Sequence, residues 1–515
     1  MRWPLPLARA LAAALLLHLV PAPSAAQQPA EGGAAALPAA SPLLPADHWA
    51  LRAAARAEAL GLAPGYLPAQ RSAPRAAVGE ALRRAALAAE ARDPRVAALA
   101  RGWWERFVEE FPEAGGAERG TLALLGGAAG GGYERRGGLA EPGAGLFGRR
   151  TGITALPLHS TLVGTGTVAG ALTPSLAAVA EPRLSEEGVV VARWDVTAGW
   201  GPVALSAGEE PVGYGPGEGG GIVLSGAQAL PRVQLETSRP LALPGFLRFA
   251  GPVAFHTFVS RLDERRHPGD PYLWGMRVAL RPHPRLTVGI NRASIFGGDS
   301  VATEVGPRSV GRMLLGILSD DFENQVVAAE FRYRPPTERV LPLVLYLEWG
   351  ADDGAGAWWD VPARVLGAYV PAVPGLPAVA AGAEYTRFAA LCCGNPGWYT
   401  HAAQPGGWAA EGATLGHPLG GEGQEFLLYS HAELEDARLR LEGRAFRRER
   451  GREGYDAFPR AGNLFAPELA GWSTGASLAT RWRVTPHTEL RLRALREVGS
   501  EWRSHELDLN ASVLF

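Results

Sequence analysis

The sequence has almost no cysteine, the residue that staples small exported domains. Its two cysteines, Cys392 and Cys393, are adjacent among 515 residues. A disulfide between neighbours is strained, and one pair cannot staple a chain of this length. The pair is open to two interpretations, a redox or metal switch and a loop tip that carries thiols. The second is favoured, because metal sites usually space their cysteines two to four residues apart.

An excess of charge of one sign is also absent. The chain has no lysine, and its 50 basic residues nearly balance 52 acidic ones, for a net charge of -2. No basic field therefore indicates a nucleic-acid partner. The 66 glycines, 42 prolines and 15 tryptophans are numerous for a helical protein. They are typical of a chain with many turns and many amphipathic aromatic residues.

Long apolar runs are confined to the beginning of the chain. Arg2 and Arg9 precede an apolar run over residues 10–20, and Ser24 and Ala26 are the small residues of a cleavage site. This pattern predicts a signal peptide over residues 1–26. No later stretch reaches the roughly 18 apolar residues of a membrane-spanning helix. An exported chain of this kind is periplasmic, secreted or a β-barrel.

Residues 27–46 are rich in alanine, proline and glycine and predict a flexible leader. Residues 47–113 predict a small helical bundle, with the first helix ending at Leu60 before Gly61. Trp103, Phe107 and Phe111 recur at every fourth position, which indicates a packing face more often than a ligand site. The expected helix starts are Asp47, then Ser72 with Pro74, then Asp93 with Pro94.

From about residue 121 the apolar period becomes two, which is the period of a β-strand. The last strand alternates fully, and a closed barrel would remove its exposed edge by pairing it with the first strand. An apolar face toward lipid and a polar face toward the lumen describe a transmembrane strand. The apolar set is Leu507, Leu509, Ala511, Val513 and Phe515, and the polar set is Asp508, Asn510 and Ser512.

The connections between the expected strands alternate between short and long, as they do in outer-membrane barrels. About eighteen strands fit between residues 121 and 515. The fold class predicted is therefore an antiparallel, all-β transmembrane barrel of about 18 strands with a small N-terminal helical bundle. A β-propeller would show a repeated motif of 40–50 residues, and none is present. The expected long connections are 172–187, 209–228, 295–322, 389–423 and 449–471.

Motifs of catalysis are also lacking. No G-x-S-x-G, H-E-x-x-H or C-x-x-C occurs. The glycine-rich stretch 213–221 contains G-x-G-x-x-G without the strand–turn–helix context of a nucleotide fold, so we interpret it as a loop. His401, His417 and His431 lie near serines and acids only in sequence. We therefore do not expect an enzyme, although a site that assembles only in space stays open.

A cluster of carboxylates accompanies two tryptophans in one connection. Glu348, Asp352 and Asp353 precede Trp358 and Trp359. Paired carboxylates act as acid and base in glycosidases. Adjacent ones at a strand end usually point apart, so calcium binding or a solvated loop is favoured over catalysis.

The longest expected loop, 389–423, brings Trp398, Tyr399 and Trp408 into a glycine-rich setting. Aromatic faces with nearby carboxylates and amides suit sugar rings. Two structural alternatives are an aromatic belt at the membrane interface and a loop folded into the barrel as a plug. Spacing alone favours these alternatives.

The ordered set of stretches in the barrel region resembles the capsule assembly Wzi family of outer-membrane proteins. This resemblance implies a non-enzymatic surface lectin in the cell outer membrane that anchors exported capsular polysaccharide or exopolysaccharide, without cofactor or metal. From the matched loop it suggests Trp398, Tyr399, Trp408 and His417 as sugar contacts, with Asp352 and Asp353 as polar partners. The matching stretches are 208–235, 277–298, 344–353, 383–388 and 398–426.

Three further possibilities stay open. The region from His48 also resembles a surface-layer homology repeat, which would imply that the helical bundle touches cell-wall polymer. The arginine-rich inward faces are also found in pores, so a porin or a polysaccharide export channel is the main alternative function. An outer-membrane hydrolase is the third. A barrel would also contact outer-membrane lipid, and the terminal Phe515 suits recognition by the barrel-assembly machinery.

Overall fold

The computed structural model describes most of the chain from residue 40 onward, within the unit Pro38–Phe515. The predicted signal peptide and most of the predicted leader lie outside the described residues. The described residues are 40–115, 123–140, 154–173, 175–185, 188–262, 267–299, 301, 304–315, 323–352, 362–388, 391–392, 395–396, 398–410, 413–434, 437–451 and 469–515.

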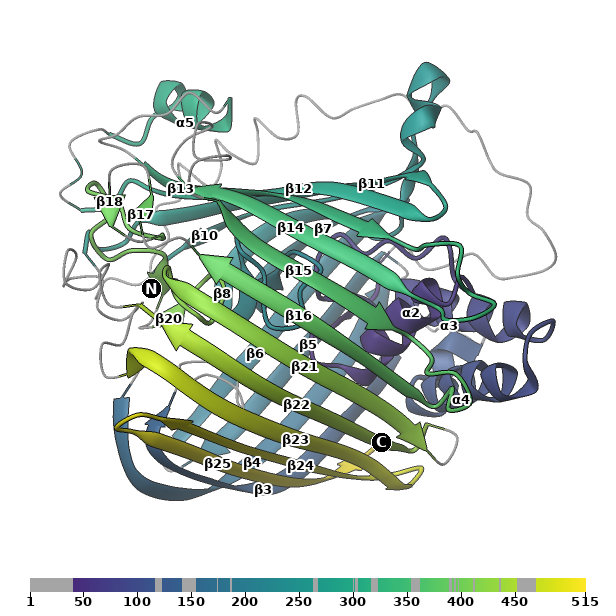
Figure 1. Ribbon diagram of the computed structural model, residues 1–515. Helices are drawn as coiled ribbons and strands as arrows, with labels where there is room; N and C mark the ends of the chain where they lie inside the picture. Colours follow the sequence, from purple (N-terminus) through teal and green to yellow (C-terminus); the bar gives the residue numbers. More distant parts are fainter. Residues whose placement is uncertain are drawn as a thin grey trace. The chain divides into compact units, whose positions relative to one another are not determined.

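The main element is a closed antiparallel barrel of eighteen strands, which confirms the predicted fold class (Figure 1). No helix within the described ranges is long and apolar enough to cross a membrane. In chain order the strands are β3 (Ala123–Ala140), β4 (Thr154–Thr173), β5 (Leu176–Ser185), β6 (Gly188–Trp200), β7 (Val203–Gly213), β8 (Ser225–Thr237), β10 (Pro252–Arg261), β11 (Tyr272–His283), β12 (Leu286–Phe296), β13 (Glu323–Tyr333), β14 (Val344–Asp352), β15 (Ala363–Val370), β16 (Val379–Phe388), β21 (Gly423–Leu434), β22 (Leu439–Arg450), β23 (Gly471–Thr485), β24 (Thr488–Gly499) and β25 (Arg503–Leu514).

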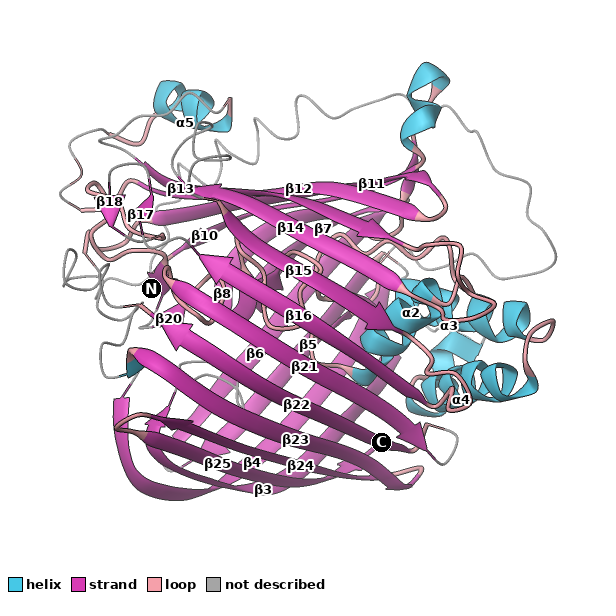
Figure 2. Ribbon diagram, viewed as in Figure 1, coloured by secondary structure: helices cyan, strands magenta, loops and turns pink. Residues whose placement is uncertain are grey.

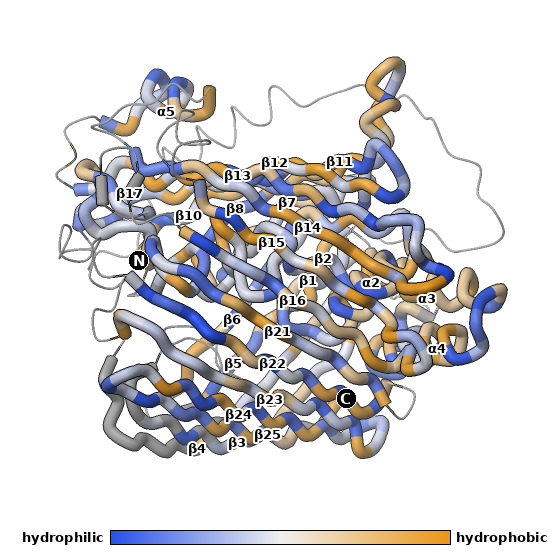
Figure 3. Tube along the Cα trace, in the orientation of Figure 1, coloured by the Kyte–Doolittle hydropathy of each residue, from blue (hydrophilic) through white to orange (hydrophobic). Residues whose placement is uncertain are grey.

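The barrel closes where its last strand, β25, pairs with its first, β3. Along β25 the polar set Asp508, Asn510 and Ser512 is buried inside, while Val513 and Phe515 are exposed on the outer face. The same alternation of polar and apolar residues appears along the neighbouring strands in Figure 3. The predicted orientation of the terminal strand is confirmed, and β25 pairs with β24 on one side and with β3 on the other.

The connections differ in length between the two ends of the barrel. One end carries turns such as 284–285, 371–378 and 486–487. Its longer connections are 334–343 and 238–251, and the latter contains β9 (Leu241–Ala242) and a 3₁₀ helix, η2 (Gly245–Ala250). The other end carries most of the long connections. They contain α5 (Pro307–Leu314), β17 (Leu391–Cys392), β18 (Asn395–Pro396), β19 (Ala409–Ala410) and β20 (Ala413–Thr414).

The prediction of one long loop is wrong. Most of residues 172–187 belong to β4 and β5, with a short turn between the two strands. The strand β5 has three alanines in its first five residues, so its two faces differ little in hydropathy. A strand of small residues therefore looked like a loop in the sequence.

Three helices lie at the end with the short turns (Figure 2). They are α2 (Trp49–Ala59), α3 (Arg75–Ala89) and α4 (Pro94–Glu110), followed by the 3₁₀ helix η1 (Pro112–Gly115). The third start is confirmed, because the Asp93 side chain accepts from the Arg95 amide at 2.8 Å. The first cap is His48 and not Asp47, because the His48 ring accepts from the Ala50 amide.

The bundle has its own apolar core. Trp49, Trp103 and Phe107 are almost completely buried there, which confirms the packing role of the aromatic stripe. Leu43 and Leu44 are also buried, in the two-residue strand β1 (Leu43–Leu44), which pairs with β2 (Ala73–Pro74). Within the predicted leader, Leu44 packs into the core of the bundle, and the Leu43 carbonyl accepts from Arg193 of β6.

Buried ion pairs fix α2 inside the barrel. The Glu58 carboxylate meets Arg281 of β11, at 3.2 Å, and also Arg332 and Arg334. Burial alone would raise the pKa of Glu58, but these arginines hold that pKa below its usual value. Two residues earlier, Arg56 contacts Glu433 of β21 at 2.6 Å. Opposite charges from one helix thus clamp several strands of the wall.

We expect Glu58→Gln to loosen α2, because three arginines would face no charge. Breaking one partner of a buried ion pair costs about 3–5 kcal/mol. Amide exchange along α2 should become at least tenfold faster in hydrogen-exchange mass spectrometry. Glu80→Gln is the matched control, because among the described residues Glu80 pairs only with Arg83 and Arg84 of its own helix. Equal exchange of α2 in both variants would contradict the clamp.

Candidate functional site

Two loops from the end with long connections fold into the lumen. Residues 214–224 join β7 to β8, and residues 398–422 belong to the connection between β16 and β21. Their apolar side chains form one buried cluster with inward-facing residues of the wall. The described lumen is thus occupied from one end by the helices and from the other by these loops.

Wall carboxylates hold the first loop through its backbone. Glu384 of β16 accepts from the amides of Glu218 and Gly219, at 2.7 and 3.0 Å. Glu348 of β14 accepts from the Ile222 amide at 3.1 Å. A Cβ on Gly219 would lie 2.7 Å from the Glu384 carboxylate. The glycines of this stretch therefore allow the backbone to approach the wall, which confirms the loop interpretation.

The second loop is tied to the first by hydrogen bonds from its large aromatic residues. The Tyr399 hydroxyl donates to the Ile222 carbonyl at 2.5 Å and accepts from the His417 amide at 3.1 Å. The Trp408 indole donates to the Val223 carbonyl at 2.8 Å. The rings of Tyr399 and Trp408 stack with centroids 6.4 Å apart. These contacts join the two loops into one unit.

Five of the six predicted site residues lie together. Asp352, at the end of β14, accepts from the Tyr399 amide at 2.7 Å. Trp398 packs edge-on against Phe388 of β16, with ring centroids 5.5 Å apart. The side chains of Trp398, Tyr399, Trp408 and His417 are 0 % exposed, and Asp352 is 2 % exposed.

These five residues therefore form the core of the loop unit, and none of the three large rings has a free face. Of the two alternatives to sugar contact, a loop folded into the barrel as a plug agrees with this arrangement, and an aromatic belt at the membrane interface does not. Direct contact with a sugar stays a prediction that would require the loops to open. Asp353, Trp358, Trp359 and Cys393 lie outside the described residues, and Cys392 belongs to β17.

His417 is a neutral imidazole within this core. Burial, together with Arg448 and Arg71, lowers its pKa from 6.5 to about 3. Its Nδ1 accepts from the Leu419 amide at 3.2 Å, and its Nε2 lies 3.4 Å from the Thr386 hydroxyl. A protonated ring would have no lone pair for the Leu419 amide, so the loop geometry also opposes the charge.

Glu218 is the charged contact between the first loop and the helical bundle. It meets Arg52 of α2 at 3.0 Å and Arg444 of β22 at 2.6 Å. Burial opposes its ionisation, but the two arginines hold its pKa at about 2. The helical bundle at one end of the lumen and the loop unit at the other are thereby connected through the Glu218 carboxylate.

Sequence reasoning did not identify the wall carboxylates as loop anchors. Glu384 was only part of a matched stretch, and Glu348 was considered for catalysis or calcium. The available signal was strand alternation, which places Glu348 and Glu384 on the inner face, where an isolated carboxylate needs donors. The donors are backbone amides more than a hundred residues away, so their identity required the fold.

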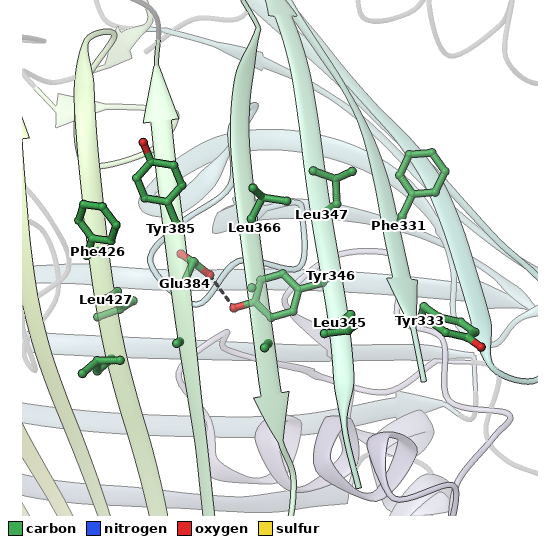
Figure 4. Close-up of a pocket in the computed structure, with 14 residues that line it drawn as sticks. Phe331, Tyr333, Leu345, Tyr346, Leu347, Leu366, Glu384, Tyr385, Phe426 and Leu427 are labelled. Atoms are coloured by element: carbon green, nitrogen blue, oxygen red, sulfur yellow. Dashed lines mark hydrogen bonds between the residues drawn. The ribbon is translucent and has the colours of Figure 1, made fainter. Parts of the chain in front are cut away.

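The barrel has a groove on its outer wall and a smaller cavity in its lumen. A groove of about 640 Å³ lies on the outer wall across β13 to β21, where Ala368 and Ala383 leave space between larger residues (Figure 4). Its apolar outward side chains suit lipid and not a sugar. A smaller cavity of about 260 Å³ lies inside the lumen beside α2. Its lining includes Tyr369, Tyr429, Arg52 and Glu218.

The closed barrel with polar residues inside and apolar residues outside defines an outer-membrane β-barrel protein. The family model for capsule assembly protein Wzi matches residues 165–502. The chain therefore belongs to the capsule assembly Wzi family, as the resemblance indicated. Family and barrel together confirm the predicted location in the outer membrane.

The chain is similar to a solved structure of Wzi from Escherichia coli, described as an outer-membrane protein of group 1 capsule assembly and a carbohydrate-binding β-barrel. The TM-score is 0.68 at 15% identity, over 91% of this chain and 98% of that one. OprD from Pseudomonas aeruginosa has a TM-score of 0.45 at 12% identity, over 77% of this chain and 94% of that one. No curated protein matches.

We expect Tyr399→Phe to weaken the connection between the two loops. The change leaves the Ile222 carbonyl and the His417 amide without a partner, and a buried unpaired group costs about 1–3 kcal/mol. Amide exchange in residues 214–224 and 398–422 should become about tenfold faster. Tyr385→Phe removes a hydroxyl that bonds Gln424 instead, and should leave both loops unchanged.

We also expect acid to loosen the loop unit. The folded pKa of His417 lies below the unfolded value, so the unfolded state binds the proton first as the pH falls. Stability is therefore present above about pH 6.5 and declines toward pH 3. Protection of residues 398–422, corrected for intrinsic exchange, should fall about tenfold per pH unit in that window. A pH dependence unchanged in His417→Gln would contradict this assignment.

Proposed function

We propose that this protein is a surface lectin that binds an exported capsular polysaccharide or exopolysaccharide and anchors it at the cell surface. Membership of the capsule assembly family supports a role in capsule assembly, and the similar Escherichia coli protein is described as carbohydrate-binding. The observation that carries the proposal is the filled lumen. A barrel closed by its own loops and helices is suited to hold a ligand on its surface and not to conduct it.

The loop unit provides the scaffold of the proposed binding end. Asp352 and Glu348 of β14 and Glu384 of β16 fix it to two strands through backbone amides. A ligand that binds a preorganised surface loses less free energy to the ordering of loops. We propose that Trp398, Tyr399, Trp408 and His417 act with Asp352 chiefly by holding this unit in shape.

The channel alternative receives less support from the described residues. An open path would require both α2 and the loop unit to move, and Glu218 ties the two together. The luminal arginines are mostly paired with carboxylates, as Arg56 is with Glu433. The packing of the helical bundle in the lumen therefore explains the inward-facing arginines.

Deletion of the gene in its host tests the proposal. We expect the polymer to be made in the same amount but released into the medium, because its anchor is gone. Cell-bound and released polysaccharide would be measured separately. Polymer trapped inside the cell would indicate an export channel, and unchanged attachment and yield would contradict a role in capsule assembly. Complementation with Tyr399→Phe, compared with Tyr385→Phe, would then show whether attachment depends on the loop unit.

A further inference from the structure

The helix α5 covers part of the outer wall at the end with long connections, opposite α2 to α4 (Figure 1). Met313, on its inner face, is 1 % exposed and packs against Trp274 of β11 and Phe296 of β12. On these strands Leu273, Ala293 and Ile295 belong to the luminal core. Because side chains alternate, Trp274 and Phe296 point outward. The helix therefore lies on the outside of the barrel.

The wall beneath α5 is polar, unlike the wall further along. Arg292 points outward between two inward neighbours and donates to the carbonyls of Met313 and Leu314, at 2.6 and 3.2 Å. Ser294 donates to Glu323 at 2.7 Å on the same outer face. Charged groups are not placed in the hydrocarbon layer without large cost. This part of the wall consequently lies outside the hydrocarbon layer.

Aromatic residues beside α5 indicate the same level. Tyr272 and Phe296 stack with ring centroids 5.7 Å apart, and Trp274 lies over the Arg292 guanidinium. Outer-membrane barrels carry such girdles of aromatic residues at both membrane interfaces. Trp274 and Phe296 lie beneath Met313 of α5, and this aromatic cluster in a polar part of the wall is consistent with a helix at the membrane interface.

The free face of α5 carries cationic and apolar side chains. Arg308 and Arg312 are exposed and lie four residues apart, which places them on one side of the helix. Leu314 is 47 % and Leu315 is 78 % exposed just beyond them. Among the described residues, Glu304 lies on the turn before the helix, and Glu323 lies beneath it with Ser294 and interacts electrostatically with Arg312. The side chains of Arg308 and Arg312 stay exposed beside these two glutamates.

We propose that α5 is a docking site for phosphate-bearing lipid headgroups of the outer leaflet. Arg308 and Arg312 pair with the phosphates, and Leu314 and Leu315 enter the acyl region below them. Amphipathic helices at interfaces combine apolar insertion with attraction to anionic lipid in this way. Long connections mark the extracellular end of such barrels, so the lipid is that of the outer leaflet. This site is separate from the loop unit, and it does not depend on the sugar-binding proposal.

Retention of a phosphorylated glycolipid tests the inference. The full-length protein would be reconstituted in phosphatidylcholine nanodiscs with a minor fraction of diphosphoryl lipid A, released into neutral detergent, and examined by native mass spectrometry. We expect Arg308→Gln with Arg312→Gln to retain about thirtyfold less lipid A than the unaltered protein, since each of the two arginines near a charged surface contributes about 1 kcal/mol. Lipid A without phosphates should be retained weakly by both.

A double variant at the other end is the matched control. Arg248, in η2, and Arg339, in the turn after β13, are also exposed arginines. Arg248→Gln with Arg339→Gln removes the same charge and should retain lipid A like the unaltered protein. Equal loss in the two double variants would show unspecific attraction and overturn the proposal. Unchanged retention in the α5 variant, or equal retention of the lipid without phosphates, would also overturn it.

Discussion

Carboxylates on the inner wall of the barrel hold the rest of the structure in place. A charge inside a lumen from which protein excludes water is tolerated only with donors around it. Glu384 and Glu348 find theirs in backbone amides of the first loop, and Glu433 finds a guanidinium on α2. The helical bundle shows the opposite arrangement, because its own carboxylate, Glu58, lies among arginines of the wall. Helices, loops and wall are therefore specified together, because each satisfies charges of another.

The sequence predicted the barrel because its physics is local. A transmembrane strand must alternate, so each strand shows its lumen face and its lipid face within about ten residues. The orientation of Asp508, Asn510 and Ser512 followed from this rule alone. The rule failed at β5, because alanines occupy both faces of this strand. Its two faces then have similar hydropathy, so the sequence shows no alternation of polar and apolar residues. The cap of the first helix was predictable only to within one residue, because His48 and Asp47 both carry suitable acceptors, whereas the Asp93 cap was predicted correctly.

The candidate site could be predicted as a set but not as an arrangement. The residue types of the loop 398–422 indicate a special structure, and five predicted residues do gather at one place. Their burial could not be read from the sequence, because aromatic residues in a glycine-rich loop suit a ligand surface and a folded core equally well. The difference lies in Ile222 and Val223, whose carbonyls receive the Tyr399 and Trp408 donors from nearly two hundred residues away.

A barrel closed at both ends has consequences for how such a protein would hold a polymer. Its lumen carries structural charge, so the surface available to a ligand is the outer side of the loop unit and the connections around it. That surface is supported by hydrogen bonds to the wall and, through the Glu218–Arg52 ion pair, by the helical bundle at the other end of the barrel. Pulling on a polymer attached there would load strands and helices together. For a protein proposed to anchor a chain at the cell surface, this distribution of load explains why a closed lumen is of more use than an open one.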